Sequence, residues 1–228
     1  MDAVRVALLR EVLAGSEWLP ATRRFAGSLR MSLRGAARAA AHGRGGGLLL
    51  VGTREYEPWH LAAHLDDEAA WSGQPELCPT LVRYRVPPAA PAHLAVDLSR
   101  LEAAGRGETV LVVAPGEPGA GLLERVSDAR RGGATVLALV GPGGGPGAGP
   151  GGSPPGGSRE LAALAHDALA PDPAGGVDLD TLQHLVGAAA GETGAPAGAA
   201  PARSGRRRFT DRLARLAEQL AVPPPPRW

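Results

Sequence analysis

The stretch GETVLVVAPGEPGAGLLERVSDARRGGATVLALV, residues 107–140, decides the fold. Residues 109–113 and 134–140 are short apolar runs beside turn residues, which is typical of strands buried on both faces of a parallel sheet. Between them, residues 118–131 have the periodicity of a helix. A strand, a crossover helix and a second strand make a right-handed unit, so this segment predicts an open α/β sheet.

The same pattern occurs before this segment. Residues 48–51 form an apolar run bounded by glycines, and residues 58–71 begin with a proline that suits the first turn of a helix. Residues 81–85 alternate as a strand does, and residues 97–104 have the spacing of a short helix. We therefore predict an α/β fold with an open, mainly parallel, doubly wound sheet flanked by helices. The three strongest strands should be adjacent or nearly adjacent.

The flanking segments extend this core. Residues 4–14 and 21–42 have helical spacing and predict an N-terminal helical pair. A helix is expected to resume at Ser158, a short strand to follow at 168–170, and a last core helix to span 177–189.

Changes in composition divide the chain into three parts. Residues 1–45 are expected to be N-terminal helices that pack on the core, and residues 46–190 are the α/β core. Its segment 141–157 is almost entirely glycine and proline, which predicts a flexible insert. Residues 191–228 form a linker followed by a basic helix.

Composition excludes several classes of chemistry. The chain has 228 residues and a net charge of +1, and all 24 basic residues are arginine. A P-loop lysine and a Schiff-base lysine are therefore excluded. Cys78 is the single cysteine, so an internal disulfide and a multi-cysteine zinc site are excluded as well. The apolar runs are too short for a membrane span, and the N-terminus mixes charges into its apolar stripe, so we expect a cytoplasmic protein.

Candidate ligand-binding residues lie in two turns. In an open parallel sheet, ligands bind beyond the carboxyl ends of the strands. The turns at 52–58 and 114–121 follow such ends and lead into helices, whose N-terminal N–H groups suit anions. Neither turn contains the GxGxxG pattern of a dinucleotide-binding domain. The candidates are Gly52, Thr53, Arg54, Glu55, Gly116, Glu117 and Gly119.

A histidine pair lies on the helix that follows the first strand. His60 and His64 are four residues apart, so they share one face of that helix. This spacing can place two neutral imidazoles on one divalent metal ion. The simpler interpretation is a pair of packing or surface histidines beside Asp66 and Asp67.

The order of elements resembles the SIS (sugar isomerase) domain family, in particular its phosphoheptose isomerase branch. Those proteins begin with two helices, followed by a strand that ends in a glycine turn and by a helix that carries a histidine. Residues 48–52 and 59–65 match this layout, and residues 98–111 and 126–139 look like later segments of the family. The resemblance covers about residues 3–190 and implies a phosphorylated sugar as ligand and a homodimer.

The phosphate loop departs from the family pattern. The isomerases bind phosphate through a loop rich in serine and threonine, whereas residues 114–120 here contain no hydroxyl group. Pro115 and Pro118 remove two amide donors, and Glu117 adds a charge that repels phosphate. We therefore expect the phosphate site to be degraded or retuned and efficient isomerase activity to be lost.

The metal-binding pattern of the family is also incomplete. In the zinc-using isomerases, a histidine is followed four residues later by a glutamate, and His60 and His64 occupy these positions. The family takes further ligands from a glutamine and a histidine on the last core helix, but Gln183 and His184 are adjacent and lack the wider spacing. The sequence therefore predicts no metal and no cofactor, with zinc as the alternative. Where catalysis is retained, the candidate catalytic residues are His60, His64, Gln183 and His184.

The C-terminal segment carries a separate charge. Residues 203–228 have a net charge of +5, whereas the remainder of the chain has a net charge of −4. An amphipathic helix at 208–221 would dock on its own domain or a second copy, or bind an anionic partner.

The function favoured by the sequence is a sugar-phosphate or nucleotide-sugar binding or sensing domain that acts as a pseudoenzyme. One alternative is an active phosphoheptose-type sugar-phosphate isomerase. The other is a non-catalytic dimeric scaffold that uses the basic arm to bind a partner.

Overall fold

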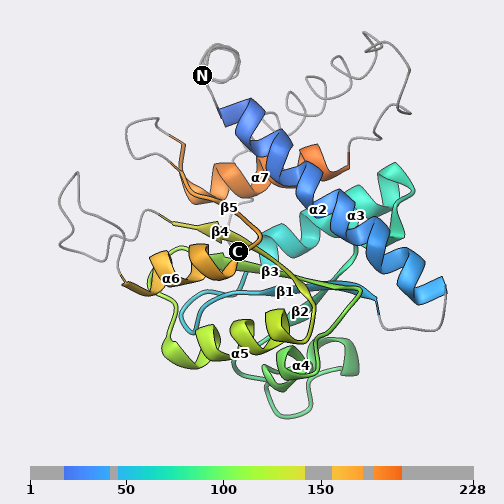
Figure 1. Cartoon of the computed structure of the whole chain (residues 1–228). Coiled ribbons are helices and arrows are strands. Elements are labelled where there is room, and N and C mark those ends of the chain that lie inside the picture. The colour runs from blue at the N-terminus through green and yellow to red at the C-terminus, as the bar shows by residue number, and fades with distance from the viewer. Residues whose placement is uncertain (1–17, 42–45, 142–155, 172–176, 192–228) are drawn as a thin grey trace, which may run out of the picture.

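The computed structural model describes residues 18–41, 46–141, 156–171 and 177–191 (Figure 1). In chain order the helices and strands are α2 (Trp18–Ala41), β1 (Gly47–Val51), α3 (Trp59–Ser72), β2 (Pro79–Val82), α4 (Ser99–Glu102), β3 (Glu108–Ala114), α5 (Ala120–Arg131), β4 (Thr135–Val140), α6 (Gly156–Leu164), β5 (Asp167–Leu169) and α7 (Leu179–Ala190). Two short 3-10 helices, Pro75–Leu77 and Ala92–Leu94, lie on either side of β2.

The five strands form one sheet in the order β2-β1-β3-β4-β5, and every pair of neighbours is parallel. Strands β1, β3 and β4, which correspond to the three apolar runs of the sequence, lie next to one another. The predicted fold class is therefore confirmed, and so is the predicted adjacency of its central strands.

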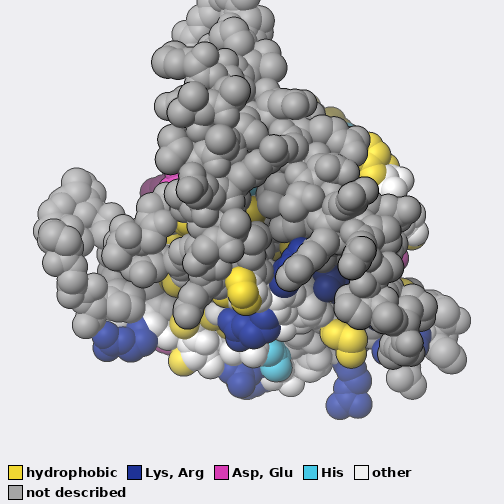
Figure 2. Space-filling model, turned by 90° about the horizontal axis from the view of Figure 1, so that it is seen from above, with side chains coloured by type: hydrophobic (Ala, Val, Ile, Leu, Met, Phe, Trp, Pro, Cys, Tyr) yellow, Lys and Arg dark blue, Asp and Glu magenta, His cyan; other side chains and the backbone are white. Residues whose placement is uncertain are grey.

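Helices cover both faces of the sheet (Figure 1). Successive residues of a strand point to opposite faces. Leu48 and Leu50 of β1 pack with α2, α3 and α7, while Leu49 and Val51 pack with α4, α5 and α6. Every residue of β3 is buried, as expected for a continuous apolar strand that is covered on both sides. Helix α2 carries arginines and no acidic residue. Figure 2 shows the molecule from above, with separate arginine side chains at the surface.

The connections create a switch point in the sheet. Helix α3 leads from β1 to β2 on one face, and α5 leads from β3 to β4 on the other face. The chain therefore leaves the neighbouring strands β1 and β3 in opposite directions. In open α/β sheets, the crevice outside the carboxyl ends at such a point is the usual ligand position. The turns after β1 and β3, which hold the candidate ligand-binding residues, border this crevice.

Some element boundaries differ from the prediction. The strand expected at 81–85 is β2, which ends at Val82, because its partner β1 ends at Val51 opposite it. Beyond this point the Arg83 N–H donates to the carbonyl oxygen of Val96 instead. The expected helix at 97–104 is the shorter α4, and α6 begins two residues before Ser158.

The helices expected at 4–14 and 208–221 and most of the insert at 141–157 lie outside the described residues. The proposed three-part division of the chain stays a prediction. In the part of the chain that the structure describes, no helix combines the length and apolar character that a membrane crossing needs.

The turn after β1 requires glycine at position 52. A β-carbon on Gly52 would lie 1.8 Å from the carbonyl oxygen of Tyr56 and 2.8 Å from Cδ of Pro58. The Tyr56 N–H donates to the carbonyl oxygen of Thr53 at 3.2 Å, so the chain folds tightly back on the end of the strand. A side chain at position 52 would force this turn open.

We predict that Gly52→Ala lowers the free energy of unfolding by about 2 kcal/mol or more, because backbone atoms must move to accept the methyl group. Urea unfolding measures the change. The control is Gly35→Ala in α2, where a β-carbon would meet nothing within 4 Å. That variant should gain about 0.5–1 kcal/mol from helix propensity. Equal stability of the two variants would contradict this account of the turn.

Candidate functional site

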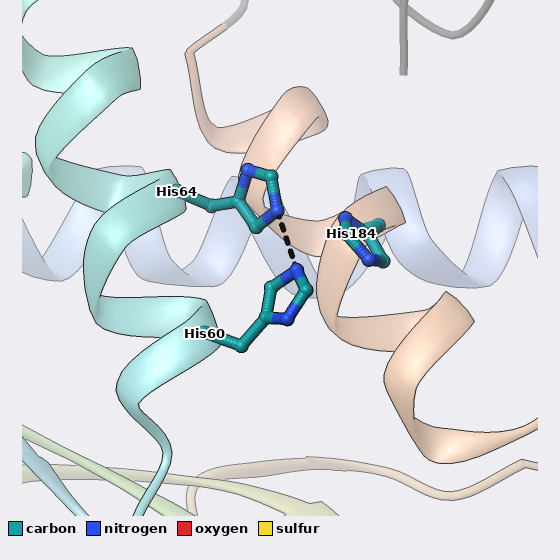
Figure 3. A group of neighbouring side chains, drawn as sticks. All are labelled: His60, His64 and His184. Atoms are coloured by element: carbon teal, nitrogen blue, oxygen red, sulfur yellow. Dashed lines mark hydrogen bonds between the residues drawn. The ribbon is translucent and has the colours of Figure 1, made fainter. Parts of the chain in front are cut away.

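Two helices that start at the carboxyl edge of the sheet bring three histidines together (Figure 3). Helix α3 follows the β1 turn and carries His60 in its first turn and His64 one turn later. Helix α7 begins after Asp178, whose carboxylate accepts from the Thr181 N–H at 2.7 Å, and carries His184 in its second turn. His60 and His64 are neighbours because they are one turn apart on α3, whereas His184 is 120 or more residues away in the sequence and joins them only through the packing of α3 on α7.

The three rings are in mutual contact. The Nε2 atoms of His60 and His64 are 2.9 Å apart and share a hydrogen bond, so one of them donates and the other accepts. The ring centroid of His184 lies 4.4 Å from that of His60 and 4.4 Å from that of His64. One nitrogen from each ring can be chosen so that all three lie within 4.8 Å of one another.

Burial favours the neutral form of two of these imidazoles. Desolvation, and after it the nearby His64 and His60, lower the pKa of His184 to about 4 against an opposing effect of Asp178. Desolvation and then His60 lower the pKa of His64, against an opposing effect of Asp67. At neutral pH both rings are uncharged, and the lone pair of an uncharged imidazole is what a metal ion binds.

The group fits a first-row transition metal ion. Zn–N bonds of about 2.0–2.1 Å in a tetrahedral site place two ligating nitrogens about 3.3 Å apart. The observed separations, 2.9 Å between the Nε2 atoms of His60 and His64 and at most 4.8 Å for one nitrogen from each ring, lie on either side of this value. His184 Nδ1 is buried without a hydrogen-bond partner. A buried nitrogen without a partner is costly in a purely structural cluster and useful in a ligand.

The structure separates Gln183 from the three histidines. Its side chain is 1% exposed, and its amide meets the Tyr56 hydroxyl, the carbonyl oxygen of Leu179 and the carboxylate of Asp180. Although Gln183 and His184 are adjacent in the sequence, their side chains leave α7 in different directions. The expectation of no metal rested on the missing glutamine–histidine spacing, and the structure supplies a third imidazole without that spacing.

The turn after β1 combines buried and exposed candidates. Gly52 lies against the Tyr56 carbonyl and Thr53 is 3% exposed, so these two residues build the turn. Arg54 and Glu55 are exposed at the switch point. Arg54 forms no ion pair with a described residue. Burial raises the pKa of the nearby Tyr84 hydroxyl, and the positive charge of Arg54 is among the effects that oppose this rise. Arg54 is therefore the candidate in this turn that is available to an anion.

The turn after β3 has both structural and open positions. The carboxylate of Glu117 accepts from the Gly157 N–H and so holds the turn against the first residues of α6. A β-carbon on Gly116 or Gly119 would meet nothing within 4 Å. Gly119 is the N-cap of α5 and supplies no capping side chain. The first N–H groups of α5 thus lie behind an open glycine turn.

Four residues near the site, Tyr56, Glu57, Trp59 and Arg83, were not identified as candidates. The guanidinium of Arg83 pairs with the carboxylate of Glu57 at 3.0 Å and lies 5.0 Å from the ring centroid of Trp59, whose indole N–H donates to Glu57 at 2.7 Å. Tyr56 lies in the quoted turn and contacts α7. Glu57 and Trp59 lie just before His60 in the sequence, which was a local signal for them. The contacts of Arg83 with Glu57 and of Tyr56 with Gln183 span 26 and 127 residues and leave no local pattern.

Cys78 is not a candidate nucleophile. Hydrogen bonding to Asp66, followed by burial, raises the pKa of its thiol to about 11. The thiolate, which is the reactive form, is therefore scarce at neutral pH.

Comparison with known proteins gives no family. No family model matches the chain, and no curated protein matches it. Among solved structures, a protein from Salmonella typhimurium LT2 described as sugar-binding has a TM-score of 0.41 and 15% identity, over 92% of this chain and 56% of that one. The NanR protein of Vibrio vulnificus complexed with ManNAc-6P has a TM-score of 0.37 and 11% identity, over 97% of this chain and 75% of that one. This chain thus spans little more than half the length of the first. At TM-scores below 0.5, neither similarity supports a functional conclusion.

The lowered pKa of His184 predicts a pH dependence in protein freed of metal by a chelator. The unfolded chain binds a proton near the ordinary value of 6.5, whereas the folded chain binds it only near 4. The unfolding free energy should therefore fall as pH decreases from about 6.5 to about 4, and this contribution should level off below that range.

Urea unfolding at a series of pH values measures this dependence. His184→Gln should flatten the curve relative to the wild type, because one of the two histidines with a lowered pKa is gone. His93→Gln removes an exposed histidine and should leave the curve parallel to the wild type. An unchanged slope in His184→Gln would contradict the assigned pKa.

Proposed function

We propose that this chain is a sugar-phosphate-binding domain that holds a divalent transition metal ion at His60, His64 and His184. The observation that carries the proposal is the convergence of three imidazoles, two of them with lowered pKa values, at the carboxyl edge of a parallel sheet. Neutral imidazole is the preferred protein ligand for zinc and also binds copper, nickel and iron. Three histidines leave coordination positions for ligand oxygens, and a bound metal ion would supply Lewis acidity toward a carbonyl or hydroxyl oxygen.

The switch point supports a phosphorylated ligand. Arg54 is an exposed guanidinium beside the crevice, and guanidinium binds phosphate through two parallel hydrogen bonds. At the same edge of the sheet, the open glycine turn before α5 leaves backbone N–H groups that favour an anion, and the Glu117 carboxylate of this turn is held by the Gly157 N–H. A sugar phosphate would place its phosphate in this crevice and its hydroxyl oxygens against the residues around the crevice. The expected resemblance to SIS domains agrees with this ligand class.

Binding or sensing is favoured over isomerisation. Aldose–ketose isomerisation needs a base that moves a proton between neighbouring carbons. The carboxylate of Glu117 is engaged with the Gly157 N–H, and the loop at 114–120 offers no hydroxyl to fix a phosphate for that chemistry. The histidines are then better explained as ligands than as an acid–base pair.

The metal proposal predicts one saturable site per chain. Titration with Co²⁺ should give visible absorption bands that saturate at one equivalent, and Zn²⁺ should displace it. His184→Asn should weaken the apparent affinity by about tenfold or more, because one of three ligands is lost. His93→Asn, which changes an exposed histidine elsewhere, should bind as the wild type does. Absence of saturable binding in the wild type would refute the metal site.

The ligand proposal predicts a role for Arg54. In a calorimetric screen of hexose and heptose phosphates, we expect binding of a phosphorylated sugar and weaker binding of its unphosphorylated form. Arg54→Met should lower the affinity by about tenfold, since a charge-assisted hydrogen bond is lost. Arg106→Met is the matched control, because Arg106 is exposed before β3, at the opposite edge of the sheet. Equal losses in both variants, or conversion of the bound sugar seen by NMR, would contradict a binding domain with this site.

A further inference from the structure

Gln183 forms a buried polar link between the ligand turn and the histidine helix. Its amide lies 3.1 Å, through Oε1, and 3.0 Å, through Nε2, from the hydroxyl of Tyr56. Within α7 the same amide nitrogen donates to the carbonyl oxygen of Leu179 and to the Asp180 carboxylate. Tyr56 is thus the described partner that ties Gln183, and with it this turn of α7, to a residue outside the helix.

The Tyr56 side of this link is held firmly. Tyr56 pairs with Thr53 across the turn, and its carbonyl oxygen fills the space beside Gly52. Burial raises the pKa of the Tyr56 hydroxyl, so the group stays protonated and able to donate. Helix α3 starts three residues after Tyr56, and His60 follows one residue later. A displacement of Tyr56 would therefore move the start of the helix that carries two of the imidazoles.

The Gln183 side of the link lies next to the third imidazole. His184 follows Gln183 directly in α7. One turn further along, a β-carbon on Gly187 would lie 3.4 Å from Cβ of His64, so α3 and α7 approach closely at the level of the cluster. With close contact on one side and the Tyr56–Gln183 bond on the other, the rotation and axial position of α7 relative to α3 are both constrained.

We propose that Tyr56 is a positioning residue for the three-histidine site, which it aligns through its hydrogen bonds to Gln183. Tyr56 does not contact the metal ion in this role. It fixes where His184 stands relative to His60 and His64, and so it sets the metal affinity. The proposal rests on the proposed metal site and adds the residue that aligns it.

The link also reaches the ligand crevice. Tyr56 closes the turn whose exposed residues are Arg54 and Glu55.

The test is metal binding by the full-length chain with Tyr56→Phe, which removes the hydroxyl and keeps the ring. We expect the apparent Zn²⁺ affinity, measured by competition with a chromophoric chelator, to fall about tenfold, as is typical when an outer partner of a ligand is lost. The Co²⁺ absorption bands should also change in position or intensity, because the ligand geometry is altered. Tyr84→Phe makes the same chemical change at the other tyrosine and should leave both readouts at wild-type values.

A merely structural role has a different signature. It would lower the melting temperature of the metal-free Tyr56→Phe protein while its Zn²⁺ affinity and Co²⁺ bands matched the wild type, and this result would overturn the proposal. A wild-type chain that binds neither Co²⁺ nor Zn²⁺ would refute the metal site and this inference with it. Wild-type binding with unchanged binding by Tyr56→Phe would refute this inference alone. Gln183→Leu, which removes the other half of the link, should reproduce the Tyr56→Phe spectrum.

Discussion

The close packing of α3 against α7 is the constraint on which the candidate site depends. Buried apolar side chains of both helices, including Leu61 and Leu65 of α3 and Leu182 and Val186 of α7, belong to the same core on one face of the sheet. Gly187 lets the two helices approach at the level of His64. The apolar contact places three imidazoles in one small space, and the same burial holds two of them in the neutral form. The packing of α3 on α7 therefore explains both the position of the three imidazoles and the neutral form of two of them.

Much of the fold follows from local pattern. Residues 109–113 and 134–140 are short apolar runs beside turn residues and are separated by one helix, so their pairing as parallel neighbours could be predicted. The ends of the strands were harder to predict. The end of β2 at Val82 is set by the end of its partner β1 and not by its own alternation, which continues to residue 85. Where a neighbouring strand sets the point at which a strand ends, the residues of that strand alone do not indicate its end.

The candidate site could be predicted in part. The spacing of His60 and His64 identifies the pair, and His184 was placed on the corresponding last helix as a candidate. The sequence could not show that His184, and not Gln183, meets the pair, because that depends on the rotation of α7 about its axis. Nor could it show the Tyr56–Gln183 contact, which joins residues 127 positions apart. Glu117 was a candidate ligand-binding residue in the sequence, but in the structure its carboxylate accepts from a backbone N–H of α6.

The central claim is that α3 and α7 together form a metal site at the carboxyl edge of the sheet. A crystal structure of the full chain grown with zinc, with diffraction data collected at the zinc absorption edge, tests it most directly. The account predicts an anomalous density peak bonded to one nitrogen each of His60, His64 and His184. A structure in which these rings stay in contact with one another and the zinc peak lies elsewhere would contradict it.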